Sequence, residues 1–138
     1  MRNIRRLICE TIMSSCRRSP IRIGNNVIDV EIADTQPLRS LGLMYRSFLP
    51  SNEGMLFSFP DEKNHSFWMR NTYIPLSIAF INRGGEIVDI ADMDPLEERN
   101  VKSHAPSCYA LEMNKGWFDN NNISAGDIVR DLPPIPFA

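Results

Sequence analysis

The sequence predicts a mostly β fold of the β-rich α+β type: a small antiparallel barrel or sandwich with about two short helices. Short segments alternate apolar and polar residues, and turn residues separate these segments. The two predicted helices are short and do not alternate regularly with the strands, which argues against an α/β fold. With 138 residues, 43% of them hydrophobic, the chain can bury one core without disulfides or a structural metal.

The first predicted strand is VIDVEIA at 27–33, in which Ile28, Val30 and Ile32 would share one face. A short helix is expected over 36–46, because N-cap residue types and a proline precede its apolar positions. Gly42 inside this segment predicts either close packing or an early helix end. A buried strand over 55–59 and a polar loop over 60–65 follow.

The clearest feature of the second half is a β-hairpin over 76–90, in which two alternating segments flank a turn that contains Gly84 and Gly85. The acidic segment 92–107 holds two prolines and predicts a long surface connection. The remaining elements are a half-buried strand at 109–113, one helical turn within 116–123, a turn at 124–127 and a last strand at 127–132.

Residues 1–20 differ in composition from the rest, since they carry five arginines against the single acidic residue Glu10. They are either a basic tail or a degenerate export signal, because a basic start precedes a weakly apolar stretch. The segment MSSC also resembles a lipoprotein cleavage site, with Cys16 as the acylated residue. The predicted organisation is this segment, one domain at 21–132 and a proline-rich tail at 133–138.

Charge, hydropathy and reactive residues argue against several classes of function. A net charge of -2 and the lack of an 18-residue apolar run argue against a nucleic-acid binder and a membrane span. His65 and His104 fall in separate polar segments and are expected to be solvated, so no metal site is predicted. Cys108 has no base nearby in the sequence. We therefore predict no catalytic residue, no cofactor and no metal.

The segment FWMRNTYIPL at 67–76 is the strongest local candidate for a binding site. Trp68, Arg70 and Asn71 supply an indole, a guanidinium and an amide, which together could orient a sugar or a small carboxylate. An architectural role is the alternative. In that case Arg70 would donate to loop carbonyls, Asn71 would serve as a turn residue, and Trp68 would close one end of the barrel.

Six motifs occur in a fixed order: GLMYR at 42–46, GMLFSF at 54–59, WMRNT at 68–72, PLSIAF at 75–80, ALE at 110–112 and GD at 126–127. Together they resemble the prokaryotic domain-of-unknown-function family 192. The resemblance implies a small barrel-like fold and no established activity. Because members often follow a secretion or lipoprotein signal, it also implies a location outside the cytoplasm. The chain departs from the family at Ser77, where relatives usually carry an acidic residue, and the weak leader leaves the cytoplasm as the alternative location.

Met44, Arg46 and Glu112 lie in these motifs and complete the candidate ligand-binding set. The predicted function is a non-catalytic ligand-binding or accessory role outside the cytoplasm, with a small molecule or a protein as partner. The alternative is a hydrolase-type enzyme that uses Arg70 with Glu112 or Asp127. A protein-interaction module would instead expose a large apolar patch.

Overall fold

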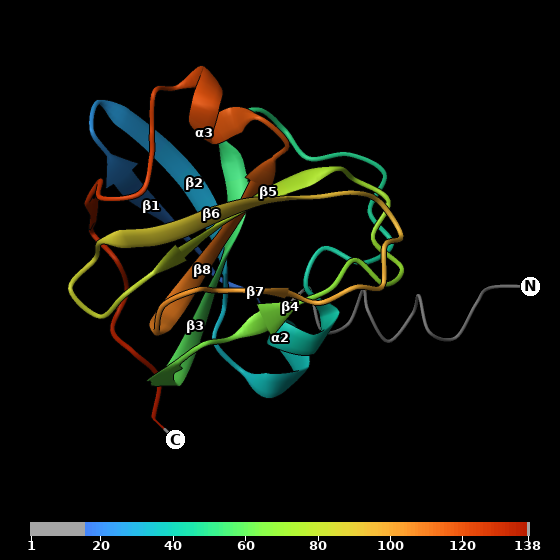
Figure 1. Ribbon diagram of the computed structural model, residues 1–138, viewed down its shortest axis with the longest axis horizontal. Helices are drawn as coiled ribbons and strands as arrows, with labels where there is room; N and C mark the ends of the chain where they lie inside the picture. Colours follow the sequence, from blue (N-terminus) through green and yellow to red (C-terminus); the bar gives the residue numbers. More distant parts are fainter. Residues whose placement is uncertain (1–15, 138) are drawn as a thin grey trace, which may run out of the picture.

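Seven strands of the computed structural model, which describes residues 16–137, form one curled sheet that makes a half-barrel (Figure 1). A two-stranded sheet lies beside it, and two short helices complete the described part of the chain. The expected mostly β fold with two short helices is therefore confirmed. The large sheet contains β1 (Arg18–Ile23), β2 (Asn26–Ala33), β3 (Glu53–Lys63), β5 (Leu76–Ile81), β6 (Ile87–Met93), β8 (Ser107–Asn114) and β9 (Val129–Arg130); the small one contains β4 (Ser66–Phe67) and β7 (Val101–Lys102); the helices are α2 (Gln36–Leu41) and α3 (Trp117–Asn120).

The strand order in the large sheet is β6-β5-β8-β3-β2-β1-β9. Its pairs are antiparallel except β2 with β3, which are parallel and are connected through α2. At one end of the curl, the amide of Val129 donates to Gly85 at 2.8 Å and the amide of Ile87 donates to Asp127 at 2.9 Å. These hydrogen bonds connect the start of one edge strand, β6, and the turn before it with the start of the other edge strand, β9, and the residues before that strand. They hold the sheet in its curled shape.

Both faces of the central strands are buried. All six residues of β5 and all but the last residue of β8 are buried. One face packs into the curl, around residues such as Ile28 and Leu111. The other face packs against α2 and the small sheet, around residues such as Leu38 and Phe57. A side chain on a central strand is therefore removed from water whichever way it points.

Helix α2 is shorter than expected, because it ends at Leu41 rather than at residue 46. Thr35 caps its start by accepting the amide of Leu38 at 3.4 Å. Gly42 ends the helix with a positive φ of 51°, which favours glycine. A Cβ at Gly42 would also lie 3.4 Å from the ring of Phe57. The glycine thus marks both an early helix end and close packing.

Three other expectations need correction. Strand β3 continues to Lys63 through much of the predicted loop 60–65, and the predicted connection 92–107 contains β7, which pairs with β4. Strand β1 begins at Arg18, so the last residues of the segment 1–20 belong to the folded domain. Strand pairing explains all three differences. Hydrogen bonds to a neighbouring strand give a segment its β structure even where its sequence shows no alternation of apolar and polar residues. The expected tail at residues 1–15 lies outside the described residues.

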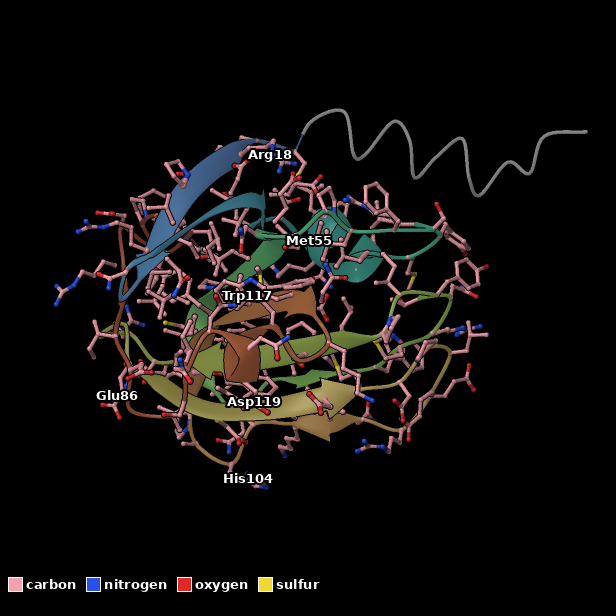
Figure 2. All side chains as sticks on the ribbon, turned by 90° about the horizontal axis from the view of Figure 1, so that it is seen from above. Arg18, Met55, Glu86, His104, Trp117 and Asp119 are labelled. Carbon is pink, nitrogen blue, oxygen red and sulfur yellow. The ribbon has the colours of Figure 1, made fainter. Side chains whose placement is uncertain are left out.

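The two histidines differ in environment. His65 is buried, contrary to expectation, because its ring stacks on Phe59 with centroids 3.7 Å apart and its Nε2 lies 3.1 Å from the carbonyl of Asp61. His104 is exposed and lies at the margin of the molecule, whereas Trp117 is inside it (Figure 2). Within residues 16–137, no group of three His, Cys, Asp or Glu side chains is placed to hold a metal ion.

Cys108 is fully buried on β8, and burial raises the pKa of its thiol to about 11. At neutral pH this thiol is protonated and inaccessible, so it is a packing residue. Among the described residues, no helix is long and apolar enough to cross a membrane.

Candidate functional site

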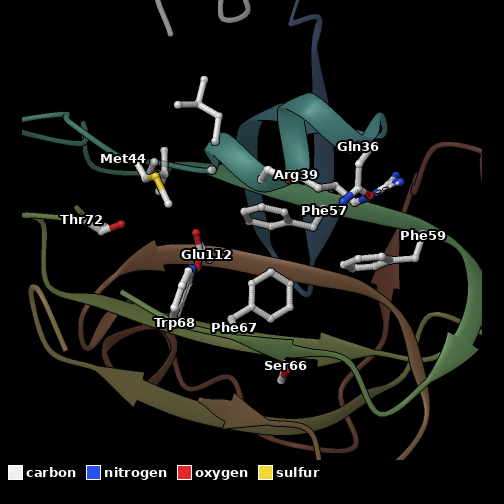
Figure 3. A pocket seen from close by; sticks show the side chains of 14 residues that line it. Gln36, Arg39, Met44, Phe57, Phe59, Ser66, Phe67, Trp68, Thr72 and Glu112 are labelled. Carbon is white, nitrogen blue, oxygen red and sulfur yellow. Dashed lines mark hydrogen bonds between the residues drawn. The ribbon is translucent and has the colours of Figure 1, made fainter. Parts of the chain in front are cut away.

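A pocket opens between α2, the segment after it, β3 and β4, with Glu112 of β8 on its floor (Figure 3). Its cavity volume is about 190 Å³. At roughly 30 Å³ per water molecule, this is room for about six waters or a ligand of similar size. The lining residues come from separate parts of the chain: Gln36, Arg39, Ser40, Leu41, Gly42, Leu43, Met44, Phe57, Phe59, Ser66, Phe67, Trp68, Thr72 and Glu112.

Glu112 is the unusual residue of this pocket. It is only 4% exposed, and its neighbours across the sheet are Met55 on β3 and Ile78 on β5, both buried and apolar. Among residues 16–137 its carboxyl has neither a hydrogen-bond nor an ion-pair partner. Burial raises the pKa of Glu112 from 4.5 to about 8. Figure 3 shows its carboxyl directed into the space between Met44 and Phe57.

Aromatic rings form much of the pocket wall. Phe57 and Phe59 lie two residues apart on β3 and so project from the same side of the strand. Phe67, on β4, meets Phe57 edge-on with ring centroids 4.9 Å apart, and its centroid lies 6.1 Å from that of Phe59. Trp68 follows at the rim and is 44% exposed. These contacts fix the wall before any ligand arrives.

Arg39 is the other ionisable residue that lines the pocket. Its Nη1 donates to the carbonyl of Ser58 at 2.9 Å, and its Nη2 donates to Oε1 of Gln36 at 3.4 Å. The guanidinium also lies 5.3 Å from the ring centroid of Phe59. In Figure 3 Arg39 and Glu112 lie on opposite sides of the Phe57 ring. The Phe57 ring therefore separates the guanidinium of the pocket from its carboxyl.

The WMRNT motif contributes less to the pocket than the sequence predicts. Arg70 is 53% exposed, lies 5.3 Å from the ring centroid of Trp68 and approaches Glu98 only to 3.9 Å. It makes no hydrogen bond to a loop carbonyl in the described part of the chain, so that expectation is wrong. Asn71 has a φ of 54° and donates to the hydroxyl of Tyr45 at 3.0 Å, as a turn residue would. Only Trp68 and Thr72 of this motif line the pocket.

The other candidates separate as well. Met44 lines the pocket, whereas Arg46 forms a largely buried, two-pronged ion pair with Glu31, including Nη2 to Oε1 at 3.1 Å. Asp127 accepts the amide of Ser124 at 2.9 Å and lines a different pocket, beside the β1–β2 turn. Neither Arg70 nor Asp127 therefore lines the pocket that holds Glu112.

The second pocket is larger, with a cavity volume of about 490 Å³. Four asparagines from two turns line it, together with three isoleucines, Gly24, Asp127 and Arg130. None of its ionisable groups is buried. The smaller pocket is the better candidate, because it combines a buried ionisable group with preformed apolar walls.

Sequence reasoning missed Arg39 and the three phenylalanines of the wall. The alternation of Phe57 and Phe59 is visible in GMLFSF, but it does not show that α2 and β4 cover that face of β3. Thr72 was noticed only as part of its motif. These residues meet through the parallel β2–α2–β3 connection, which local patterns do not reveal.

Two solved structures share this fold. A protein from Sinorhizobium meliloti 1021, described as a candidate transcription regulator, is 34% identical with a TM-score of 0.81, and the match covers 84% of this chain and 95% of that one. A protein of unknown function from Novosphingobium aromaticivorans DSM 12444 is 33% identical with a TM-score of 0.78, and that match covers 82% of this chain and 84% of the other. The search of curated proteins gave no match.

The family comparison agrees with the motif order found in the sequence. Residues 20–130 match DUF192, whose description is Uncharacterized ACR. This span begins within β1 and ends with β9, so it includes all of the curled sheet except the first two residues of β1. Because the match extends over most of the chain, the protein belongs to the DUF192 family.

Proposed function

We propose that this protein binds a small molecule in the Glu112 pocket. The supporting observation is a carboxyl that is 4% exposed and directed into a cavity, with no partner among residues 16–137. Burial makes it costly for this carboxyl to ionise, which raises its pKa to about 8. A ligand that hydrogen-bonds to Glu112 would offset this cost, whereas an apolar residue at 112 would have avoided it.

The size of the cavity and its walls restrict the ligand. About 190 Å³ suits a compact molecule rather than a polymer. The rings of Phe57, Phe59 and Phe67 favour an apolar or cationic body, and Glu112 favours a hydrogen-bond donor at one end. Trp68 at the rim is placed to contact whatever enters.

Binding is better supported than hydrolysis. The hydroxyls that line the pocket, those of Ser40, Ser66 and Thr72, have no histidine among the lining residues to act as a base. Arg70, the predicted partner of Glu112 in a hydrolase, does not line the pocket. Glu112 therefore lacks the second group that a nucleophilic mechanism needs.

A matched pair of variants tests the proposal. Glu112→Gln and Asp127→Asn each exchange a carboxyl for an amide, in the small and the large pocket respectively. A thermal-shift screen with organic cations, sugars and organic acids should yield a class that raises the Tm of the parent and of Asp127→Asn. The same compounds should act at least tenfold more weakly on Glu112→Gln. If no class acts on the parent, or if the Glu112→Gln response equals that of the parent, the proposal fails.

We also propose that the domain works outside the cytoplasm, and the resemblance to exported family members supports this. A fusion of residues 1–20 to alkaline phosphatase, an enzyme that needs an oxidising compartment, should show phosphatase activity in a bacterial host. Retention of an inactive fusion in the cytoplasm would contradict this location.

A further inference from the structure

The charges and rings of the Glu112 pocket restrict the chemical class of its ligand, an inference that rests on the proposed function. We propose that the ligand is a small organic cation, a primary to quaternary ammonium, held by the carboxylate of Glu112 and by the aromatic wall. The pocket thus takes the amine end of a compact molecule and not an acid or a sugar.

Charge is the first argument. Only Glu112 and Arg39 are ionisable among the residues that line the pocket. Arg39 already donates to the carbonyl of Ser58 and to Gln36, and it lies beyond the Phe57 ring from Glu112. Glu112 has no cation of its own in the described part of the chain. An ammonium would supply the missing charge, and one that carries N–H groups would also supply the missing hydrogen-bond donor.

The aromatic wall is the second argument. Two of its four rings already hold a guanidinium, since Arg39 lies 5.3 Å from the centroid of Phe59 and Arg70 lies 5.3 Å from that of Trp68. Cations lie within about 6 Å of ring centroids in such contacts. Phe57 and Phe67 carry no cation of the protein within residues 16–137, and Figure 3 shows both close to Glu112. They are the rings available to an ammonium paired with that carboxylate.

Competing ligand classes fit this end of the pocket less well. An anion would approach the Glu112 carboxyl with like charge once that carboxyl ionises. A neutral acceptor could accept a hydrogen bond only from the protonated carboxyl and would gain nothing from the rings' preference for cations. The cavity of about 190 Å³ has room for a trimethylammonium group with a short tail, about six or seven non-hydrogen atoms.

Binding of a cation has a distinctive proton balance. Burial raises the pKa of Glu112 to about 8, so near pH 7 the empty pocket holds its carboxyl protonated. A bound ammonium stabilises the carboxylate, and the O–H proton of Glu112 leaves to the buffer. Arg39 is the other charged group that faces the pocket, and it already donates to the carbonyl of Ser58 and to Gln36. One ligand therefore displaces close to one proton near pH 7 and almost none above pH 9.

Calorimetry with a charged probe and its neutral isostere tests this inference. Choline and 3,3-dimethylbutan-1-ol have nearly the same shape and differ by one positive charge. We expect choline to bind the parent at least tenfold more tightly than the alcohol. In buffers of different ionisation enthalpy, choline binding should release roughly 0.9 proton at pH 7. Quenching of Trp68 fluorescence should report the same affinity, and Trp68→Phe should remove that signal.

The variants separate the two proposals. Glu112→Gln should lower choline affinity at least tenfold and abolish proton release, whereas Asp127→Asn should change neither. Equal binding of the alcohol, choline binding without proton release, or no choline binding would overturn the inference. If the screen then finds a neutral or anionic compound whose effect depends on Glu112, the proposed binding function stands without it. If nothing binds, both proposals fail.

Discussion

Replacing Glu112 by glutamine should stabilise the protein at alkaline pH and leave it almost unchanged near pH 4.5. An amide has the shape of the protonated carboxyl but cannot ionise. The parent folds with a buried carboxyl whose pKa lies at about 8, whereas the same group ionises near 4.5 when exposed. Between these values the folded state holds a proton that the unfolded state releases, so the stability of the parent falls as the pH rises.

The magnitude follows from the two pKa values. Each pKa unit corresponds to about 1.36 kcal/mol, so the shift from 4.5 to about 8 corresponds to about 5 kcal/mol at most. The penalty is absent below pH 4.5, grows steadily up to pH 8 and is constant above it. This is a large fraction of the 5–15 kcal/mol that stabilises a typical domain.

Urea unfolding of the parent and Glu112→Gln, followed by circular dichroism from pH 4.5 to 9, measures the difference directly. It should rise from near zero to several kcal/mol, while Asp127→Asn follows the parent at every pH. His65 titrates in both proteins, so its contribution cancels in the difference. A difference between Glu112→Gln and the parent that does not change with pH would refute the burial argument, because a carboxyl ionised throughout carries no such linkage.

Five further substitutions test the packing and the ion pairs of the domain. Gly54→Ala should lower the unfolding free energy by about 1–3 kcal/mol, since its Cβ would lie 2.4 Å from a carbonyl oxygen of β8. The control is Gly84→Ala, whose Cβ would meet only a side-chain oxygen, at 3.4 Å. In the same urea titration it should change the unfolding free energy by less than about 0.5 kcal/mol. Arg46→Met leaves the largely buried carboxylate of Glu31 with only Arg18, at 4.0 Å, among residues 16–137 and should cost about 3 kcal/mol. Arg70→Ala, at an exposed pair, should cost less than about 1 kcal/mol by thermal unfolding, and equal effects would contradict this assignment. Burial is the main cause that lowers the pKa of His65, so below pH 6.5 the parent should lose stability relative to His65→Gln, in which Glu112 contributes equally. A difference between the two proteins that does not change with pH would show that His65 is solvated.

Local patterns predicted the strands well, because alternation records one buried face. The hairpin over 76–90 has turn residues between two alternating segments and was predicted close to its observed position. Strand β1 was not predicted as a strand, because RSP at 18–20 shows no alternation and the segment is ordered by pairing with β2. The end of α2 was marked by Gly42, but the sequence alone did not distinguish a packed glycine from a terminating one.

The site was harder to predict, because its chemistry depends on the second face of β8. The local sequence pattern does not show that other elements cover this face. Tyr109, Leu111 and Met113 indicate one buried face of β8, which would leave Glu112 on the wet face. In the structure α2 and the small sheet cover that second face, and this covering raises the pKa of Glu112. Arg70 differs from its prediction in the opposite direction. Its motif suggested a buried guanidinium that donates several hydrogen bonds, whereas its position in a loop leaves the side chain exposed.

The pocket joins two parts of the fold that tolerate change to different degrees. Glu112 lies on β8, which is paired on both sides, so little can be altered there without loss of the sheet. The opposite wall comes from α2, a six-residue helix too short to be stable without its packing. Amide hydrogens of 36–41 should therefore exchange faster than those of β8. Substitutions in this helix could reshape the entrance while the carboxyl stays in place, so one scaffold could serve different ligands through a change of its wall alone.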